Sequence, residues 1–228
     1  MTNKYMYFVA NWKMFGVLRT LNSINKVISF VKKNKKRKFK LIYCPPATLI
    51  NPLNDKVKST SIQIGAQNCH ESDIYGANTG QINSGMLKSV GAQYIILGHS
   101  ENRELGENDK LINQKIKSSI KSGLKVIFCI GETLIQKRKK KTKKILSSQI
   151  VNGLKKIRDK KNIIIAYEPV WAIGSGLIPQ NSEIIEIVKF IKSKVKGTKV
   201  LYGGSVNIKN INILNKINNV DGFLIGGA

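Results

Sequence analysis

Four polar residues, Asn11, Lys13, His99 and Glu168, stand where apolar runs of the sequence end. The stretch "AYEPVWAIGSG" (166–176) is an example, because Glu168 closes an apolar run and is followed by a proline, a tryptophan and two glycines. A carboxylate, an imidazole and an ammonium group held together can transfer a proton and stabilise the charge that develops. Any one of these residues alone is more often structural. Their shared position at the ends of runs is what indicates a site.

Glycine-rich turns follow the last two apolar runs. These turns are "YGGSV" (202–206) and "LIGGA" (224–228). Backbone N–H groups in such turns can surround an anion, and glycine lets a phosphate approach closely. Tight turns without a ligand are the simpler interpretation. The two turns together favour a phosphate site.

Eight short apolar or β-branched runs must position these residues. They cover residues 7–13, 39–46, 62–68, 92–100, 125–132, 163–170, 199–205 and 221–227. Their starts recur at about the length of a strand–helix unit, roughly 30 residues. Continuous apolar strands are typical of parallel sheets. The segments between them have helical periodicity, as in 182–195, where we expect Ser182 to cap the helix.

Eight strand–helix units predict an α/β fold, a (β/α)8 TIM barrel formed by one domain over residues 1–228. An open doubly wound sheet is the alternative, and the missing GxGxxG after the first run speaks against it. In a barrel the carboxyl ends of the strands meet on one face. The polar strand ends, with Glu132 among them, would therefore converge there.

The composition limits the class of protein. The three cysteines, Cys44, Cys69 and Cys129, have no paired spacing, which indicates reduced thiols and a cytoplasmic protein. No run has the length of a membrane span, and the first apolar residues lack a signal-peptide cleavage pattern. We expect neither a membrane nor a metal ion as a partner.

The formal net charge is +26, concentrated in residues 32–40 and 137–144. A nucleic-acid-binding face is one interpretation of these runs. They contain few aromatic residues, and the sequence has no helix-turn-helix, RRM or zinc-finger pattern. We therefore favour solvated helix surfaces and do not expect nucleic-acid binding.

Taken in order, seven motifs resemble the triosephosphate isomerase family along the whole chain. They are "ANWKM" (10–14), "GAQN" (65–68), "ILGHSE" (96–101), "CIGE" (129–132), "AYEPVWAIGSG" (166–176), "YGGSV" (202–206) and "DGFLIGGA" (221–228). The glycine motifs are weak singly, but the ordered set is highly specific.

The resemblance implies a role for each polar strand end. Glu168 would be the general base, moving one proton between neighbouring carbons without a metal or cofactor. His99 would act as a neutral hydrogen-bond donor to the developing enediolate, and Lys13 would stabilise the oxyanion and the phosphate. Asn11 would orient that site, with Glu101 as a nearby carboxylate.

The implied substrates are dihydroxyacetone phosphate and D-glyceraldehyde 3-phosphate, in glycolysis and gluconeogenesis. The phosphate would be bound by backbone N–H groups of Gly174, Ser205, Gly226 and Gly227. Cys129 would pack behind the base.

The resemblance also implies a lid, from Pro169 to Pro179. Pro169, Val170 and Trp171 would form a stiff hinge, and the glycines, Gly176 among them, would let the tip fold over the phosphate. Closure would expel water from the base.

One lid position departs from the family pattern. The family's closed lid is held by a tyrosine, here Tyr202, bonded to the N–H of the residue at the position of Pro179, and proline has no N–H. Ser205 bonding the N–H of Gly176 is the remaining candidate. We expect a lid that closes with a different balance of open and closed states.

The long segment 68–85 resembles the dimer arm of the family, with Thr79 at its tip. Gln81 and Asn102 stand where the family often has a charged pair across the interface, and Asn78 replaces a residue that is often aromatic. A neutral amide pair could replace the ion pair at small cost. We expect a homodimer with a weaker arm contact.

The printed sequence stops at "LIGGA", where relatives continue into a final helix. We therefore expect a barrel that lacks this helix, whether by natural ending or by truncation.

Two other functions remain open. A different phosphosugar isomerase or epimerase is disfavoured by the motif set, since metal-using epimerase barrels need more histidines than the two present. A non-catalytic basic protein on the same scaffold is disfavoured by the intact Asn11, Lys13, His99 and Glu168.

Overall fold

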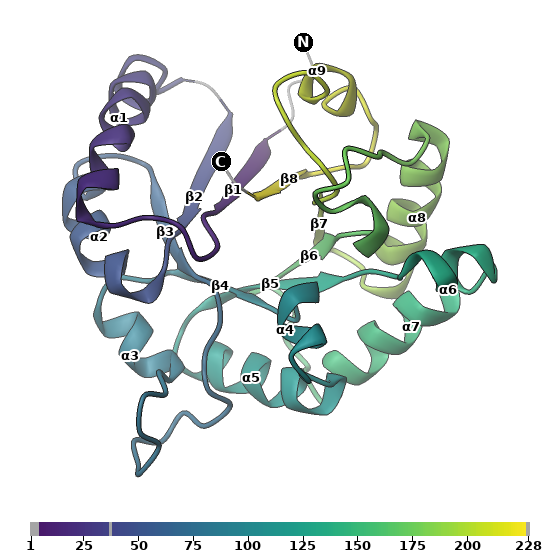
Figure 1. Cartoon of the computed structure of the whole chain (residues 1–228), viewed down its shortest axis with the longest axis horizontal. Helices are drawn as coiled ribbons and strands as arrows, with labels where there is room; N and C mark the ends of the chain where they lie inside the picture. The colour runs from purple at the N-terminus through teal and green to yellow at the C-terminus, as the bar shows by residue number, and fades with distance from the viewer. Residues whose placement is uncertain (1–4, 37, 227–228) are drawn as a thin grey trace.

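The backbone forms a closed barrel of eight parallel strands in sequence order, ringed by helices (Figure 1). The computed structural model describes residues 5–36 and 38–226. The strands are β1 Met6–Asn11, β2 Phe39–Cys44, β3 Gln63–Ala66, β4 Tyr94–Leu97, β5 Lys125–Ile130, β6 Ile163–Tyr167, β7 Lys199–Tyr202 and β8 Gly222–Gly226. The barrel predicted from the sequence is confirmed, and β8 pairs with β1 to close it.

Helices connect the strands on the outside. They are α1 Ile24–Lys33, α2 Ile50–Val57, α3 Ser84–Ser89, α4 Ser100–Glu104, α5 Asp109–Lys121, α6 Leu134–Arg138, α7 Thr142–Gly153, α8 Asn181–Lys194 and α9 Ile211–Leu214, with 3-10 turns η1 Leu18–Ser23, η2 Ala47–Leu49 and η3 Val170–Ala172. Helix α8 confirms the helix predicted at 182–195, but Ser182 does not cap it. The helix begins earlier, where the Gln180 N–H donates to Glu183 Oε2 at 3.2 Å.

Side chains alternate between two hydrophobic layers because successive residues of a strand point to opposite faces. On β6, Ile164 and Ala166 join the cluster that fills the barrel, whereas Ile163, Ile165 and Tyr167 join the cluster beneath the helices. This alternation decides which way a side chain just after a strand points.

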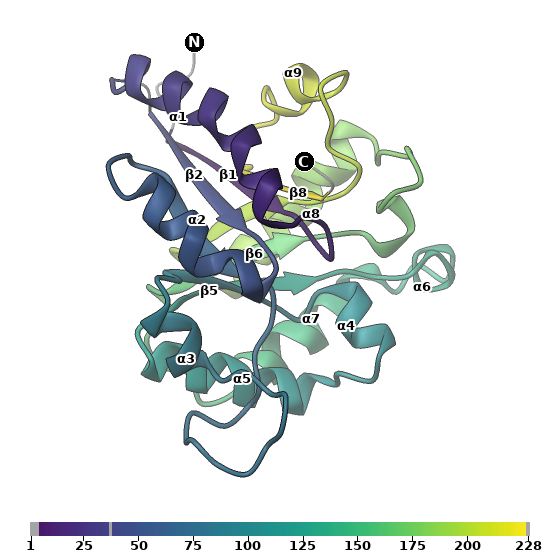
Figure 2. The ribbon, with the colours of Figure 1, turned by 60° about the vertical axis from the view of Figure 1, so that its left-hand side comes forward.

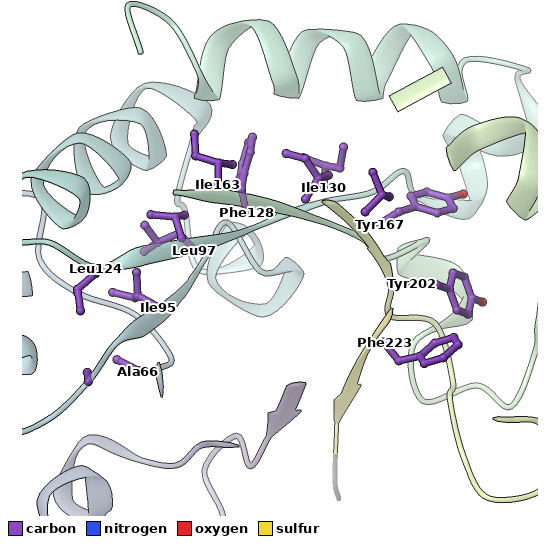
Figure 3. Close-up of a cluster of buried hydrophobic side chains, with 14 of the residues drawn as sticks. Ala66, Ile95, Leu97, Leu124, Phe128, Ile130, Ile163, Tyr167, Tyr202 and Phe223 are labelled. Atoms are coloured by element: carbon purple, nitrogen blue, oxygen red, sulfur yellow. The ribbon is translucent and has the colours of Figure 1, made fainter. Parts of the chain in front are cut away.

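Large side chains form the outer layer (Figure 3). Phe128 of β5 is fully buried, and a Cβ placed on Gly153 would lie 2.4 Å from its ring. Helix α7 can therefore lie close to β5 only with glycine at this position. Burying a side chain of this size is worth about 1.5–3 kcal/mol.

The predicted strands all exist, and strands β1 to β7 end earlier than the corresponding apolar runs. Between β3 and α3 a long segment without helix or strand projects from the body, as Figures 1 and 2 show.

Among the described residues, none of the helices combines the length and the apolar character that crossing a membrane requires. The final-helix prediction concerns sequence outside the described residues.

Candidate active site

A cavity of about 430 Å³ opens at the carboxyl ends of the strands. It collects most of the side chains that the sequence singled out. Its lining includes Asn11, Lys13, His99, Glu168, Gly174, Gly176, Gly203, Ser205 and Gly226. Gly227, a predicted phosphate ligand, lies outside the described residues.

Glu168 is the buried carboxylate of this cavity. It follows β6 on the inward side of the alternation, and only 5% of its surface is exposed. Burial raises its pKa above the ordinary value of 4.5, while His99, Cys129 and Lys13 pull the pKa down. Its Oε2 atom has no hydrogen-bond partner among the described residues. This is an ionisable group with a raised pKa and a free oxygen, which suits a base.

Two glycines make room for this carboxylate. A Cβ on Gly203 would lie 2.6 Å from Glu168 Cγ, and one on Gly131 would lie 1.8 Å from the Glu168 carbonyl oxygen. Both glycines lie in the quoted family motifs, but the sequence predicted no role for either beside the carboxylate. Their contacts with Glu168 depend on strand packing, which a sequence does not display.

His99 begins helix α4 and faces Glu168. Its Nδ1 accepts the Glu101 N–H at 3.3 Å, so the proton of the neutral imidazole lies on Nε2. That Nε2 lies 3.7 Å from Glu168 Oε1. The imidazole therefore turns its N–H toward the cavity, as a hydrogen-bond donor to a substrate oxygen would require.

Lys13 is held over the same cavity. Its Nζ lies 2.5 Å from Glu101 Oε1, and its backbone adopts a positive φ of 54°. The Asn11 side chain accepts the Lys13 N–H at 3.0 Å. Gln67 donates to the carbonyl oxygens of Lys13 and Cys44, both at 2.8 Å. These bonds stabilise the unusual backbone, and the sequence alone predicted no role for Gln67.

Cys129 lies in the barrel behind Glu168. It is fully buried, and burial followed by the charge of Glu168 raises its pKa well above the ordinary value. The thiol therefore stays protonated and uncharged beside the carboxylate. All three cysteines are free and buried.

The opposite wall of the cavity is built from turn residues. Gly174 and Gly176 have φ values of 67° and 75°, which favour glycine. Ser205 Oγ accepts the Gly176 N–H at 3.2 Å and donates to the Ala172 carbonyl oxygen. These contacts tie the tip of the predicted lid to the turn after β7. Gly226 approaches Lys13, since a Cβ there would lie 3.1 Å from Lys13 Cε.

Glu132 holds the segment that the sequence predicts to be the hinge of a lid. It follows β5 on the outward side, is 1% exposed, and accepts the Trp171 indole N–H at 3.0 Å and the Tyr167 hydroxyl at 3.3 Å. Its backbone carbonyl accepts the Val170 N–H at 3.0 Å. Burial raises the pKa of Glu132, which these donors partly offset.

The far end of the predicted lid lies at Pro179. Pro179 is buried, and the Tyr202 hydroxyl, also buried, has no hydrogen-bond partner among the described residues. A proline nitrogen cannot supply one.

The predicted arm residues lie away from the cavity. Thr79 and Gln81 are exposed in the projecting segment. Asn102 lies on α4, where its N–H donates to the His99 carbonyl oxygen at 3.0 Å. Within this chain no bond between Gln81 and Asn102 is recorded for the described residues.

A metal site needs several ligand side chains close together. Within residues 5–36 and 38–226, no three His, Cys, Asp or Glu side chains are arranged to hold a metal ion. That neither metal nor cofactor is used stays a prediction.

Known proteins share this sequence and fold. The family model described as triosephosphate isomerase matches residues 6–228. The triosephosphate isomerases of Thermodesulfovibrio yellowstonii and Bartonella tribocorum are 41% and 38% identical, over 97% of this chain and 93% and 91% of theirs. The crystal structure of triosephosphate isomerase from Bartonella henselae superposes with a TM-score of 0.88 at 34% identity, covering 98% of this chain and 92% of that one. The chain therefore belongs to the triosephosphate isomerase family.

Proposed function

We propose that this chain interconverts dihydroxyacetone phosphate and D-glyceraldehyde 3-phosphate by proton transfer through an enediolate. Family membership supports this aldose–ketose isomerisation and its place in glycolysis. The observation that carries the mechanism is the buried Glu168 carboxylate, with its unpaired oxygen, facing His99 in one cavity with Lys13.

Glu168 removes a proton from the carbon beside the carbonyl and returns it to the neighbouring carbon. Its raised pKa brings it closer to the pKa of the substrate carbon acid and so favours the transfer. The carboxylate ends the cycle in its starting state, so no oxidant or external base is consumed.

The developing oxyanion needs donors that are already in place. The Nε2–H of His99 and the ammonium group of Lys13 are two donors in the lining of the cavity. Asn11 and Gln67 hold the Lys13 backbone, and Glu101 holds its ammonium group.

The phosphate occupies the wall formed by Gly174, Ser205 and Gly226. Backbone N–H groups in glycine-rich turns suit a phosphate dianion, and the positive Lys13 adds attraction. The Ser205–Gly176 bond provides a latch for the lid over this group.

We also propose that the protein is cytoplasmic, because its three cysteines are free thiols. We propose further that the active form is a homodimer, and the support for this is a set of exposed apolar side chains in two segments. Met14 is 95% exposed beside the site residue Lys13, and Ile74 is 72% exposed in the arm. Apolar patches of this kind mark protein interfaces. The Ile74→Lys variant should run as a monomer in light scattering, whereas Ile213→Lys, on exposed α9, should remain dimeric.

The test of function is turnover of both triose phosphates by the parent and by Glu168→Gln, which has nearly the same shape but cannot accept a proton. We expect kcat to fall by about 10³-fold, within the range for a lost general base. Glu104→Gln, an exposed position on α4, is the control and should keep parental activity. Equal activity of parent and Glu168→Gln would exclude this base, and an inactive folded parent would exclude the function.

A further inference from the structure

The charge of this chain is divided unevenly between the two ends of the barrel. All acidic residues other than Asp55, Asp73, Asp159 and Asp221 lie in segments that follow strands or in the first half of a helix, near the active-site end. Asp73 follows β3 but lies 2.5 Å from the Nζ atom of Lys121, the last residue of α5. Asp221 is buried and lies 2.7 Å from the Lys192 Nζ atom. The turns that lead into the strands therefore carry little negative charge.

The same turns carry exposed basic side chains. The turn before β2 holds Lys35 and Lys36, and the turn before β3 begins with Lys58. Of the described turn residues, those before β7 and β8 add Lys196 and Lys216. These lysines are far apart in sequence, and the parallel topology alone brings them to one end.

The turn before β6 is the most basic of them. Lys155, Lys156, Arg158 and Lys161 are all exposed there, and Asp159 is the one acid. Asp159 accepts the backbone N–H of Lys161 at 2.9 Å. No ion pair is recorded for these four basic side chains among the described residues.

The basic turns are neighbours around the barrel. Strands β6, β7, β8, β1, β2 and β3 are consecutive in the closed order, so the turns before β6, β7, β8, β2 and β3 form one arc. We call these five turns the basic arc. Figure 2 shows the turn after α1, which belongs to the arc, and α6, which belongs to the active-site end, on opposite sides of the molecule.

Two lysine side chains, those of Lys40 and Lys125, also repel each other at this end of the barrel. Lys40 and Lys125 are paired in register with Tyr7 and Tyr94, which point into the barrel. Burial, followed by the repulsion of Lys125, lowers the pKa of Lys40. A bound anion at this end would relieve that repulsion.

We propose that the basic arc binds the phosphate backbone of nucleic acid without reading its sequence. The sequence favoured solvated surfaces for two charge runs considered separately, whereas the fold joins separate turns into one positive surface. Lysines bind phosphates as point charges and release condensed counterions, which gives affinity without base recognition.

An anionic membrane is the competing partner for such a surface. Stable attachment to a membrane needs an apolar or lipid anchor in addition to basic residues. In the five turns of the arc, residue 37 aside, every exposed side chain is polar or charged. The arc therefore lacks an apolar wedge, which favours nucleic acid.

The experiment measures binding of a fluorescent 20-base-pair DNA duplex of mixed sequence by anisotropy at several salt concentrations. Two arc variants remove positive charge: K155Q/K156Q/R158Q/K161Q, and independently K35Q/K36Q/K58Q. The matched control, K139Q/K140Q/K141Q/K144Q, removes four charges at the active-site end. Each four-residue set consists of exposed residues and includes one with positive φ, Lys156 at 61° and Lys140 at 55°.

We expect the first arc variant to bind at least tenfold more weakly than the parent near 0.1 M salt, and the control less than threefold. The slope of log affinity against log salt should become shallower by about 0.9 for each phosphate that the variant no longer neutralises. The second arc variant should also bind the duplex more weakly than the parent. Isomerase activity should stay parental in both arc variants, because the arc lies at the end of the barrel remote from the cavity.

Three outcomes would overturn the proposal. One is equal weakening in the arc and control variants, which would mean that overall charge alone attracts the duplex. Another is absence of duplex binding by the parent. The last is binding to vesicles containing phosphatidylserine without binding to the duplex, which would assign the arc to a membrane surface.

Discussion

Two glutamates at the ends of neighbouring strands have similar burial and opposite surroundings. Glu132 follows β5 and Glu168 follows β6, with 1% and 5% of their surfaces exposed. Glu132 accepts hydrogen bonds from Trp171 and Tyr167, whereas one oxygen of Glu168 has no partner among the described residues. A saturated carboxylate is a structural anchor, and an unsaturated one retains capacity to accept a proton.

The alternation of side chains along the strands explains the difference. On β5 the outward residues are Val126, Phe128 and Ile130, so Glu132 continues the outward face toward the lid hinge. On β6 the inward residues are Ile164 and Ala166, and Glu168 continues the inward face. A shift of one residue in position thus separates the structural carboxylate Glu132 from the proposed base Glu168.

After loss of the proposed base itself, the largest effect should come from crowding it without changing its chemistry. A Cβ on Gly203 would lie 2.6 Å from Glu168 Cγ and 2.9 Å from Oε1. We expect Gly203→Ala to lower kcat/KM by about 100-fold, the loss that a displacement of about 1 Å can cause. Gly76→Ala, where the nearest atom would lie 3.7 Å away, is the control. Parental kcat/KM in Gly203→Ala would mean that the carboxylate position is not critical.

The pH dependence should separate the two glutamates next. Because burial raises the pKa of Glu168, the base form is lost as the pH falls through a value above 4.5. Below that value kcat/KM should fall tenfold per pH unit, and Glu132→Gln should leave the midpoint in place. A midpoint of the kcat/KM profile at or below the ordinary carboxyl pKa would contradict the assignment of Glu168 as the base. A midpoint that moves in Glu132→Gln would contradict it as well.

Breaking the anchor should affect stability more than chemistry. Glu132→Gln leaves one acceptor oxygen for two buried donors and adds an NH2 group. We expect the free energy of unfolding to fall by about 1–3 kcal/mol, measured by urea denaturation, because a buried polar group loses its partner. Glu183→Gln, a half-buried carboxylate near the same hinge, should cost less. A Glu132→Gln protein as stable as the parent would show that the hinge bonds contribute nothing.

A smaller effect is expected from the cation above the hinge. Lys137 Nζ lies 3.9 Å from the centre of the Trp171 ring and 3.2 Å from Glu183 Oε2. Lys137→Gln should reduce hydrogen-exchange protection of the lid by about 0.5–1 kcal/mol, while Lys137→Arg keeps the protection. Loss in both variants, or in neither, would exclude the cation–π contact as the cause.

The smallest effect should be at Tyr202. Its hydroxyl is buried without a partner among the described residues, and Pro179 offers no N–H. Tyr202→Phe should therefore leave kcat/KM within about twofold and the free energy of unfolding unchanged or slightly higher. Ser205→Ala, which removes the bond to Gly176, is the comparison and should weaken lid closure. A large loss in Tyr202→Phe alone would show that the hydroxyl latches the lid.

The apolar runs of the sequence predicted every strand and the closed barrel because continuous apolar strands at regular spacing allow few alternatives. They did not predict where strands end. The run at 92–100 extends past β4, whose last residue is Leu97, because Gly98 takes a φ of 73° and redirects the chain toward His99. The spacing of apolar residues in a sequence does not indicate where such a turn occurs.

By itself, the sequence determined which residue types stand at the strand ends, since chain order and apolar spacing are local properties. The tertiary structure alone decided which of the two buried glutamates has an oxygen without a partner among the described residues, and that Gly203 must be small to admit this glutamate. It also decided that lysines from separate turns form one arc. These properties depend on which atoms from distant segments meet across the barrel, and that is set by strand register and packing.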